Sequence, residues 1–389
     1  MRKFLLYILL LMTAAAVSAC VYPFDPEVDR SADRHLVVEG DILIGESQCN
    51  FRLGYMLYLD EEISNKRVMA TVRVESETGR IFDGYPLSAN DYQVDLSTAG
   101  PDDRYRLHIV LEDGREYASE WAEVRKPCVV DDITHELDNM TGQVRFNITL
   151  HSDDGEKYFR WFFDEDWEYE SLYNATHKYV VDLTDPEDSG HMEEFFLGEG
   201  THYCWVSQQS TGLYFTTTRD LDSDKVQEKN FYRIPAQHQK MSSLYSMNVK
   251  VESTTEDCYD YWKNVRTNSE NLGDLFAPIP SEMRGNIYNL ADPDETVIGY
   301  VNVSMMAQKR IFVDNAETGY YVKSPYIPEE DWMIDLLPSE WRRYYVNKQY
   351  LPVSKGEGSI FYWAPKRCVD CRLQGGTKHR PDYWPNEHF

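Results

Sequence analysis

Beyond its first 20 residues, the sequence lacks any apolar run of the ~20 residues that a membrane-spanning helix needs. It is also poor in positive charge, because 39 basic residues stand against 66 acidic ones and the net charge is −27. Such an acidic chain repels nucleic acid and anionic lipid headgroups, so we expect no nucleic-acid partner. Disorder is excluded, because 42% hydrophobic and 14% aromatic residues are ample for packed cores.

Catalytic signatures are missing as well. The sequence contains no GxSxG nucleophile elbow, P-loop, HExxH zinc motif or dinucleotide-binding fingerprint. Residues 220–224 imitate the start of an EF-hand loop, but Lys225 and Phe231 stand where that loop requires glycine and glutamate. We therefore expect no enzyme activity, no bound metal and no cofactor. The alternative rests on Asp164 and Asp166, which could supply the carboxylate pair of a glycoside hydrolase.

Seven cysteines are few for a chain of 389 residues, and lipidation of one of them, Cys20, would leave an even number. An even number in an oxidising compartment favours disulfides, and we expect pairs within each domain. Cys368 and Cys371 form a CxxC motif, for which redox chemistry or half of a zinc site is the alternative, although no second CxxC is present. The disulfide candidates are Cys49, Cys128, Cys204, Cys258, Cys368 and Cys371.

The first residues carry the features of a bacterial lipoprotein signal. Basic residues precede an apolar run over 4–17, and residues 17–20, Val-Ser-Ala-Cys, fit the lipobox at which signal peptidase II cleaves. The run is too short to remain as a transmembrane helix, so we expect a signal peptide over 1–19 that is removed. Acyl chains on Cys20 would then anchor the protein in a membrane, with residues 20–33 as an acidic tether.

The patterning of residues 34–127 predicts a small β domain. Residues 67–75 alternate apolar and polar side chains with the period of a strand. Asp113-Gly114, between residues 104–111 and 115–124, is typical of a tight hairpin, because glycine accepts the positive φ of a type I′ turn. About seven short strands in this region indicate an immunoglobulin-like sandwich.

Residues 128–389 predict a larger β-rich domain with one amphipathic helix. Residues 253–255 offer N-caps, and apolar side chains from Cys258 to Val265 recur with i, i+3, i+4, i+7 spacing. Gly273 can end that helix. The rest of the region consists of strand patterns and turns, so the chain as a whole is expected to be mainly β.

Four aromatic residues lie close together in the sequence with carboxylates between them. Exposed aromatic faces beside hydrogen-bonding groups suit carbohydrate rings or a protein partner. Core packing is the alternative interpretation, and it is the more common role of such residues. These candidate contacts are Trp161, Trp167, Tyr169 and Tyr173.

Motifs spread along nearly the whole chain resemble those of a known family. They are 35–40 (His-Leu-Val-Val-Glu-Gly), 158–161, 259–262 (Tyr-Asp-Tyr-Trp), 273–276 (Gly-Asp-Leu-Phe), Pro278, Pro280, 285–286, 297–300 (Val-Ile-Gly-Tyr), 368–372 (Cys-Val-Asp-Cys-Arg), 375–376, Pro381 and Trp384. The chain is similar to the Bacteroidetes lipoproteins classed as domain of unknown function 4249. The family has no established activity, and its members are typically encoded beside TonB-dependent outer-membrane receptors.

The resemblance implies an outer-membrane lipoprotein at the cell surface that works with a TonB-dependent β-barrel. We expect a non-enzymatic accessory or ligand-capture subunit of a nutrient transporter, held to the membrane through its N-terminal lipid. A structural or biogenesis role in the outer membrane is the alternative, and a surface hydrolase is a third.

Replacing Cys20 by alanine removes the sulfur to which diacylglycerol is attached, so the variant should be soluble or mislocalised. Cell fractionation followed by immunoblotting measures this against the parent protein. Retention of the variant in the membrane fraction would argue against lipid anchoring.

Overall fold

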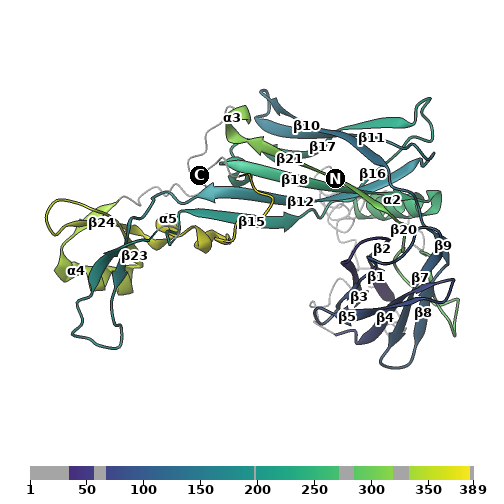
Figure 1. Cartoon of the computed structure of the whole chain (residues 1–389), viewed down its shortest axis with the longest axis horizontal. Coiled ribbons are helices and arrows are strands. Elements are labelled where there is room, and N and C mark those ends of the chain that lie inside the picture. The colour runs from purple at the N-terminus through teal and green to yellow at the C-terminus, as the bar shows by residue number, and fades with distance from the viewer. Residues whose placement is uncertain (1–34, 57–66, 197–198, 271–283, 319–332, 386–389) are drawn as a thin grey trace, which may run out of the picture.

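The computed structural model describes residues 35–56, 67–196, 199–270, 284–318 and 333–385. The predicted signal peptide (1–19), Cys20 and the tether (20–33) lie outside the described residues, as does Gly273. The predicted mainly β fold class is confirmed, and the elements form three parts: central sheets, an N-terminal domain packed beneath one end of them, and a C-terminal module beyond the other end (Figure 1). Among the described residues no helix is both long and apolar enough to cross a bilayer.

The N-terminal domain is a curled antiparallel sheet in the order β1-β3-β6-β5-β4-β7-β8, whose two halves pack on one core. The predicted hairpin is confirmed: β7 pairs with β8, and Gly114 takes a φ of +87° in the turn between them. The strands are β1 (Leu36–Glu39), β2 (Ile42–Leu43), β3 (Cys49–Tyr55), β4 (Ala70–Ser76), β5 (Ile81–Pro86), β6 (Asp91–Val94), β7 (Arg104–Leu111), β8 (Glu116–Ser119) and β9 (Ala122–Glu123).

A later segment of the chain returns to complete this domain. β19 (Ile287–Asn289) extends the sheet beyond β8, and β20 (Val303–Ser304) pairs in parallel with β2. Val297 and Val301 between them are buried in the same core. Residues 128–389 are predicted to form the larger domain, but the structure differs, because this apolar segment buries its side chains in the N-terminal core.

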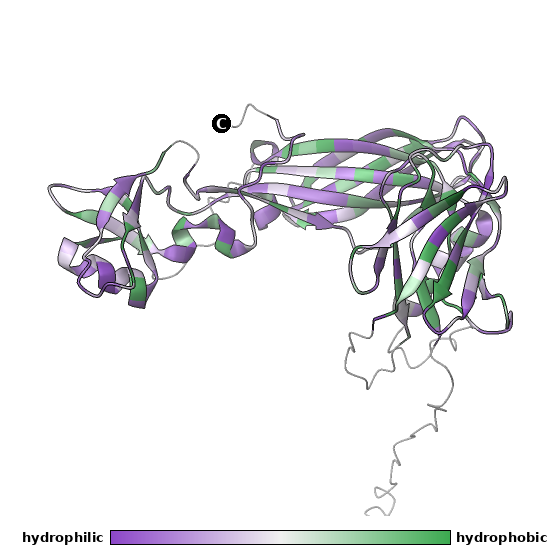
Figure 2. Ribbon diagram, turned by 60° about the horizontal axis from the view of Figure 1, so that its bottom comes forward, coloured by the Kyte–Doolittle hydropathy of each residue, from purple (hydrophilic) through white to green (hydrophobic). Residues whose placement is uncertain are grey.

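Two facing sheets make up the central part, and their inward side chains form a second core. The long strands alternate in hydropathy along their length (Figure 2), as a strand with one inward face requires. One sheet comprises β10 (Val129–Asp138), β11 (Gln143–His151) and β17 (Lys225–Pro235). The other comprises β15 (Tyr203–Gln209), β12 (Tyr158–Glu170), β18 (Leu244–Thr254) and β21 (Met306–Asp314), with β16 (Tyr214–Thr217) also paired to β12.

The predicted amphipathic helix is α2 (Glu256–Glu270), which contacts β12. The hydroxyl of Thr255 accepts a hydrogen bond from the Cys258 backbone N–H at 3.1 Å, as an N-cap does. Cys258 and Tyr261 are both buried, as the apolar spacing predicted. Short elements beside the sheets are η1 (Gln239–Met241) and α3 (Asn315–Thr318).

A C-terminal module projects from the end of the central sheets opposite the N-terminal domain (Figure 1). A small aromatic core around the fully buried Trp363 holds it together. The module contains β13 (His177–Val180), β14 (His191–Glu194), β22 (Ile334–Leu336), α4 (Pro338–Arg343), the π-helical η2 (Tyr344–Lys348), β23 (Tyr350–Lys355), β24 (Phe361–Pro365), α5 (Lys366–Val369) and η3 (Cys371–Gln374).

A buried charge cluster joins the N-terminal domain to the central sheets. Arg160 on β12 donates from Nε to Glu252 on β18 at 2.6 Å, and its Nη2 also contacts Asp41 after β1. Asn302 and Ser304 of the returning segment donate to Glu252 at 3.0 and 3.2 Å. The side chain of Glu252 is only 1% exposed. Burial raises the pKa of the Asp41 carboxyl, although Arg160 acts to lower it.

Replacing Arg160 by methionine should lower the free energy of unfolding by about 3–5 kcal/mol, because Glu252 is left as an uncompensated buried charge. Arg52→Met is the matched control, since Arg52 pairs with Asp91 at 2.7 Å but its side chain is 65% exposed. The control substitution should lower the free energy of unfolding by about 1 kcal/mol or less. Urea unfolding followed by tryptophan fluorescence measures the stability of both variants. An equally small loss of stability in the two variants would contradict the conclusion that the buried charge cluster joins the N-terminal domain to the central sheets.

Candidate functional site

The aromatic candidates do not form an exposed face. Trp161, Trp167 and Tyr169 are 3%, 6% and 0% exposed, because they lie on the face of β12 that the sheet β10-β11-β17 covers. Tyr173 is half-buried and packs against the small cluster that contains Val353. The interpretation of these residues as surface contacts is therefore wrong, and the alternative of core packing holds.

Asp164 and Asp166 point to the other face of β12, where each meets a cation, whereas Glu165 points inward and pairs with Lys240 at 2.5 Å. Asp164 pairs with Lys250 at 2.6 Å, and Asp166 pairs with Arg310 at 2.9 Å. Asp166 also accepts a hydrogen bond from Ser207 at 2.6 Å. These contacts give both carboxylates a structural partner on a neighbouring strand.

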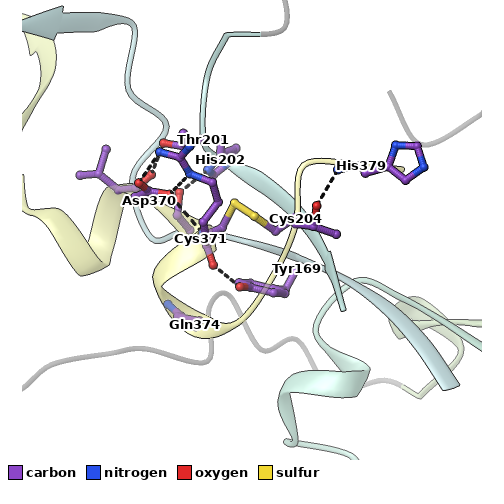
Figure 3. Close-up of a disulfide and its surroundings, with 12 residues drawn as sticks. Tyr169, Thr201, His202, Cys204, Asp370, Cys371, Gln374 and His379 are labelled. Atoms are coloured by element: carbon purple, nitrogen blue, oxygen red, sulfur yellow. Dashed lines mark hydrogen bonds and ion pairs between the residues drawn. A yellow bond between two sulfur atoms is a disulfide. The ribbon is translucent and has the colours of Figure 1, made fainter. Parts of the chain in front are cut away.

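One disulfide fastens the C-terminal segment to the central sheet. Cys204 on β15 bonds to Cys371 on η3, across 167 residues of sequence and a Cα–Cα distance of 5.8 Å. Figure 3 shows the bond beside Tyr169, whose hydroxyl donates to the carbonyl oxygen of Cys371. Two backbone hydrogen bonds of 2.8 and 2.9 Å between Trp205 and Thr377 continue the attachment.

The other disulfide candidates differ from expectation. Cys49, Cys128, Cys258 and Cys368 are buried and form no disulfide in the structure. Cys49 and Cys128 cannot pair, because the first packs in the N-terminal core and the second in the central core. The CxxC motif is not closed on itself either, since Cys371 is bonded to Cys204.

A cavity of about 840 Å³ opens where the C-terminal module meets the central sheet, and we call it the junction cavity. Its walls come from the β13–β14 hairpin, the start of β15 and the segment after η3. Small-molecule sites typically measure about 300 to 1,000 Å³ and are mostly apolar with a few polar groups. The lining includes His177, Phe195, His202, Tyr203, Trp205 and Lys378.

His202 in this wall takes part in a Ser–His–Glu arrangement. Its Nδ1 lies 3.0 Å from the Ser171 hydroxyl, and its Nε2 lies 3.3 Å from the Glu170 carboxylate. Burial lowers the pKa of His202, while Glu170 acts to raise it. Ser171 is 1% exposed and donates its proton to the carbonyl oxygen of Tyr173 at 3.0 Å, so this hydroxyl is not presented to a substrate.

No sequence pattern predicts this site. Glu170 and His202 show no ligand or catalytic spacing along the chain, and they meet because β12 pairs with β15. Within the described residues, no group of three His, Cys, Asp or Glu side chains has the geometry to hold a metal ion.

The family described as "Domain of unknown function (DUF4249)" matches residues 21–310. The chain belongs to this family. The match covers the N-terminal domain and most of the central part, whereas the cysteine motif at 368–372 lies beyond it. No curated protein matches the sequence.

Among solved structures, two domains of biofilm-associated proteins align weakly. The first, "Biofilm associated protein - BSP domain", has a TM-score of 0.15 and 6% identity over 75% of this chain and 61% of its own. The second, "Biofilm associated protein - B domain", has a TM-score of 0.16 and 6% identity over 75% of this chain and 87% of its own. This chain therefore spans less than two thirds of the first domain's length.

Loss of the disulfide should destabilise the attached C-terminal segment. Cys204→Ala and Cys371→Ala should each lower the free energy of unfolding by about 2–4 kcal/mol, because the long loop between the two positions becomes unconstrained in the unfolded chain. The double variant should melt no lower than the worse single variant, since the bond is already absent. Thermal melting without reductant measures this, and additive losses from the two substitutions would contradict the pairing.

Proposed function

We propose that this protein is a non-enzymatic outer-membrane lipoprotein that captures a small ligand for a TonB-dependent nutrient transporter. The observation that carries the proposal is the junction cavity, whose 840 Å³ is of the size that small-molecule sites have. Membership of the family, the lipobox ending at Cys20 and the missing catalytic motifs support the same reading.

The shape of the molecule suits capture away from the membrane. An anchor attached ahead of residue 35 holds the N-terminal domain, in which β1 lies, closest to the lipid. The C-terminal module lies at the opposite end of the central sheets (Figures 1 and 2), and the junction cavity opens where that module meets the central sheet. A ligand or a barrel at that end would meet the cavity before it met the anchored domain.

The lining supplies contacts of two kinds. Phe195, Tyr203 and Trp205 offer aromatic area, and Lys378 offers a cationic group. Aromatic area with a small number of polar groups is the composition expected of a site for a partly apolar solute. The disulfide and the Trp205–Thr377 bonds hold one wall rigid, which lowers the entropy cost of binding.

Affinity purification of the tagged protein from crosslinked native outer membrane tests the proposal. A TonB-dependent barrel should be recovered in near-equal amount, as identified by mass spectrometry. An unrelated lipoprotein with the same tag and anchor is the control for non-specific recovery. Repeated recovery without any such barrel would contradict the proposal, and recovery with assembly machinery would favour the structural or biogenesis role.

A further inference from the structure

A second cavity, of about 430 Å³, lies between the N-terminal domain and the outer face of the central sheet. We call it the interdomain cleft. One wall is the segment from β1 to β3, and the other is formed by β12, β15 and β18. The residues that matter for its chemistry are Asp41, Gln48, Asn50, Phe162, Gln209 and Lys250.

Two of the three charged groups of the cleft already have partners, whereas Glu46 has no ion-pair partner among the described residues. Lys250 donates to Asp164 at 2.6 Å, and Asp41 is held by Arg160 and by the backbone N–H of Asn302 at 3.0 Å. An anionic ligand would have to break the Lys250–Asp164 pair or lie beside the Glu46 carboxylate without a counter-ion, and either is costly at a partly buried site. The cleft therefore disfavours an anionic ligand, and the Glu46 carboxylate can accept hydrogen bonds from hydroxyl groups.

Side-chain amides dominate the remaining polar groups. Gln48 is exposed and makes no hydrogen bond with any described residue. Asn50 uses its oxygen to accept from Gln93 at 2.8 Å, which leaves its two N–H donors for a ligand. Gln209 donates weakly to Asp164 at 3.5 Å, so its oxygen is open as an acceptor. Amides on both walls can thus donate to and accept from hydroxyl groups.

An aromatic ring completes the site. Phe162 is half-buried and lies on the same face of the sheet as Lys250, whose ammonium is 5.8 Å from the ring centroid. Such a ring gives apolar contact to the C–H face of a sugar, while amides bind its hydroxyls. The volume is near the lower end of the range of about 300 to 1,000 Å³ for small-molecule sites, which fits one or two sugar rings.

We infer that the interdomain cleft binds a neutral mono- or disaccharide. Its ligand contacts both walls, so binding also draws the N-terminal domain and the central sheet together across the Arg160 cluster. The inference concerns a site distinct from the junction cavity and needs no transporter, so it can fail or hold independently of the proposed function.

Binding is measured with the purified mature chain on a microarray of plant and mammalian glycans, with a peptide library probed in parallel. Neutral glycans should be retained. Isothermal titration with the terminal disaccharide of the strongest glycan should then give a dissociation constant that Gln209→Ala and Asn50→Ala each weaken about tenfold, because each removes a hydrogen-bonding amide.

Gln208→Ala is the matched control. Gln208 is the exposed neighbour of Gln209 on β15, and alternation along the strand places it on the other face of the sheet. Its affinity should be unchanged. Absence of binding to every glycan, retention of peptides alone, or unchanged affinity in both cleft variants would overturn the inference. Loss of binding on Tyr203→Ala with no effect of Gln209→Ala would move the sugar to the junction cavity and overturn it too.

Discussion

The buried ion pair between Arg160 and Glu252 is the contact on which the arrangement of the molecule depends. Glu252 is almost fully buried, and two segments stabilise it: Arg160 of β12 neutralises its charge, and Asn302 and Ser304 of the returning segment donate hydrogen bonds to it. A buried charge of this kind is tolerated in one geometry and penalised in others, so it specifies how the N-terminal domain sits on the central sheet. The interdomain cleft exists next to this cluster because the two walls are held at a defined separation.

Charged side chains of β12 also connect the central sheet to other parts of the molecule. Most of its inward residues are aromatic and fill the central core, where Glu165 pairs with Lys240, while its outward charged residues contact different parts of the chain. Arg160 reaches the N-terminal domain, Glu168 accepts from the indole N–H of Trp384 at 2.8 Å, and Glu170 meets His202 at the junction cavity. The aromatic residues of this strand therefore mostly belong to its core face, and most of its carboxylates belong to its outer face. The two cavities lie near one end of β12 and along its outer face.

Features with a local cause could be predicted from the sequence. Helix α2 follows from its Thr255 cap and apolar spacing, and the β7–β8 hairpin follows from Gly114. Features that join distant segments could not. The return of residues 287–304 into the N-terminal core, the Cys204–Cys371 bond and the Glu170–His202 contact depend on strand pairing between segments far apart in sequence. Both cavities lie between such segments, which is why no motif in the sequence pointed to them.

Native-state hydrogen exchange of the mature chain tests most directly whether the N-terminal domain and the central sheets form one cooperative unit. The amides of Ile42 and Ile44 bond to the returning segment, and Val249 lies in the middle of β18. If the Arg160 cluster joins the two parts, these amides should exchange with the same opening free energy. Exchange at Ile42 and Ile44 with a much smaller opening free energy than at Val249 would show that the N-terminal domain opens on its own, and would contradict the account.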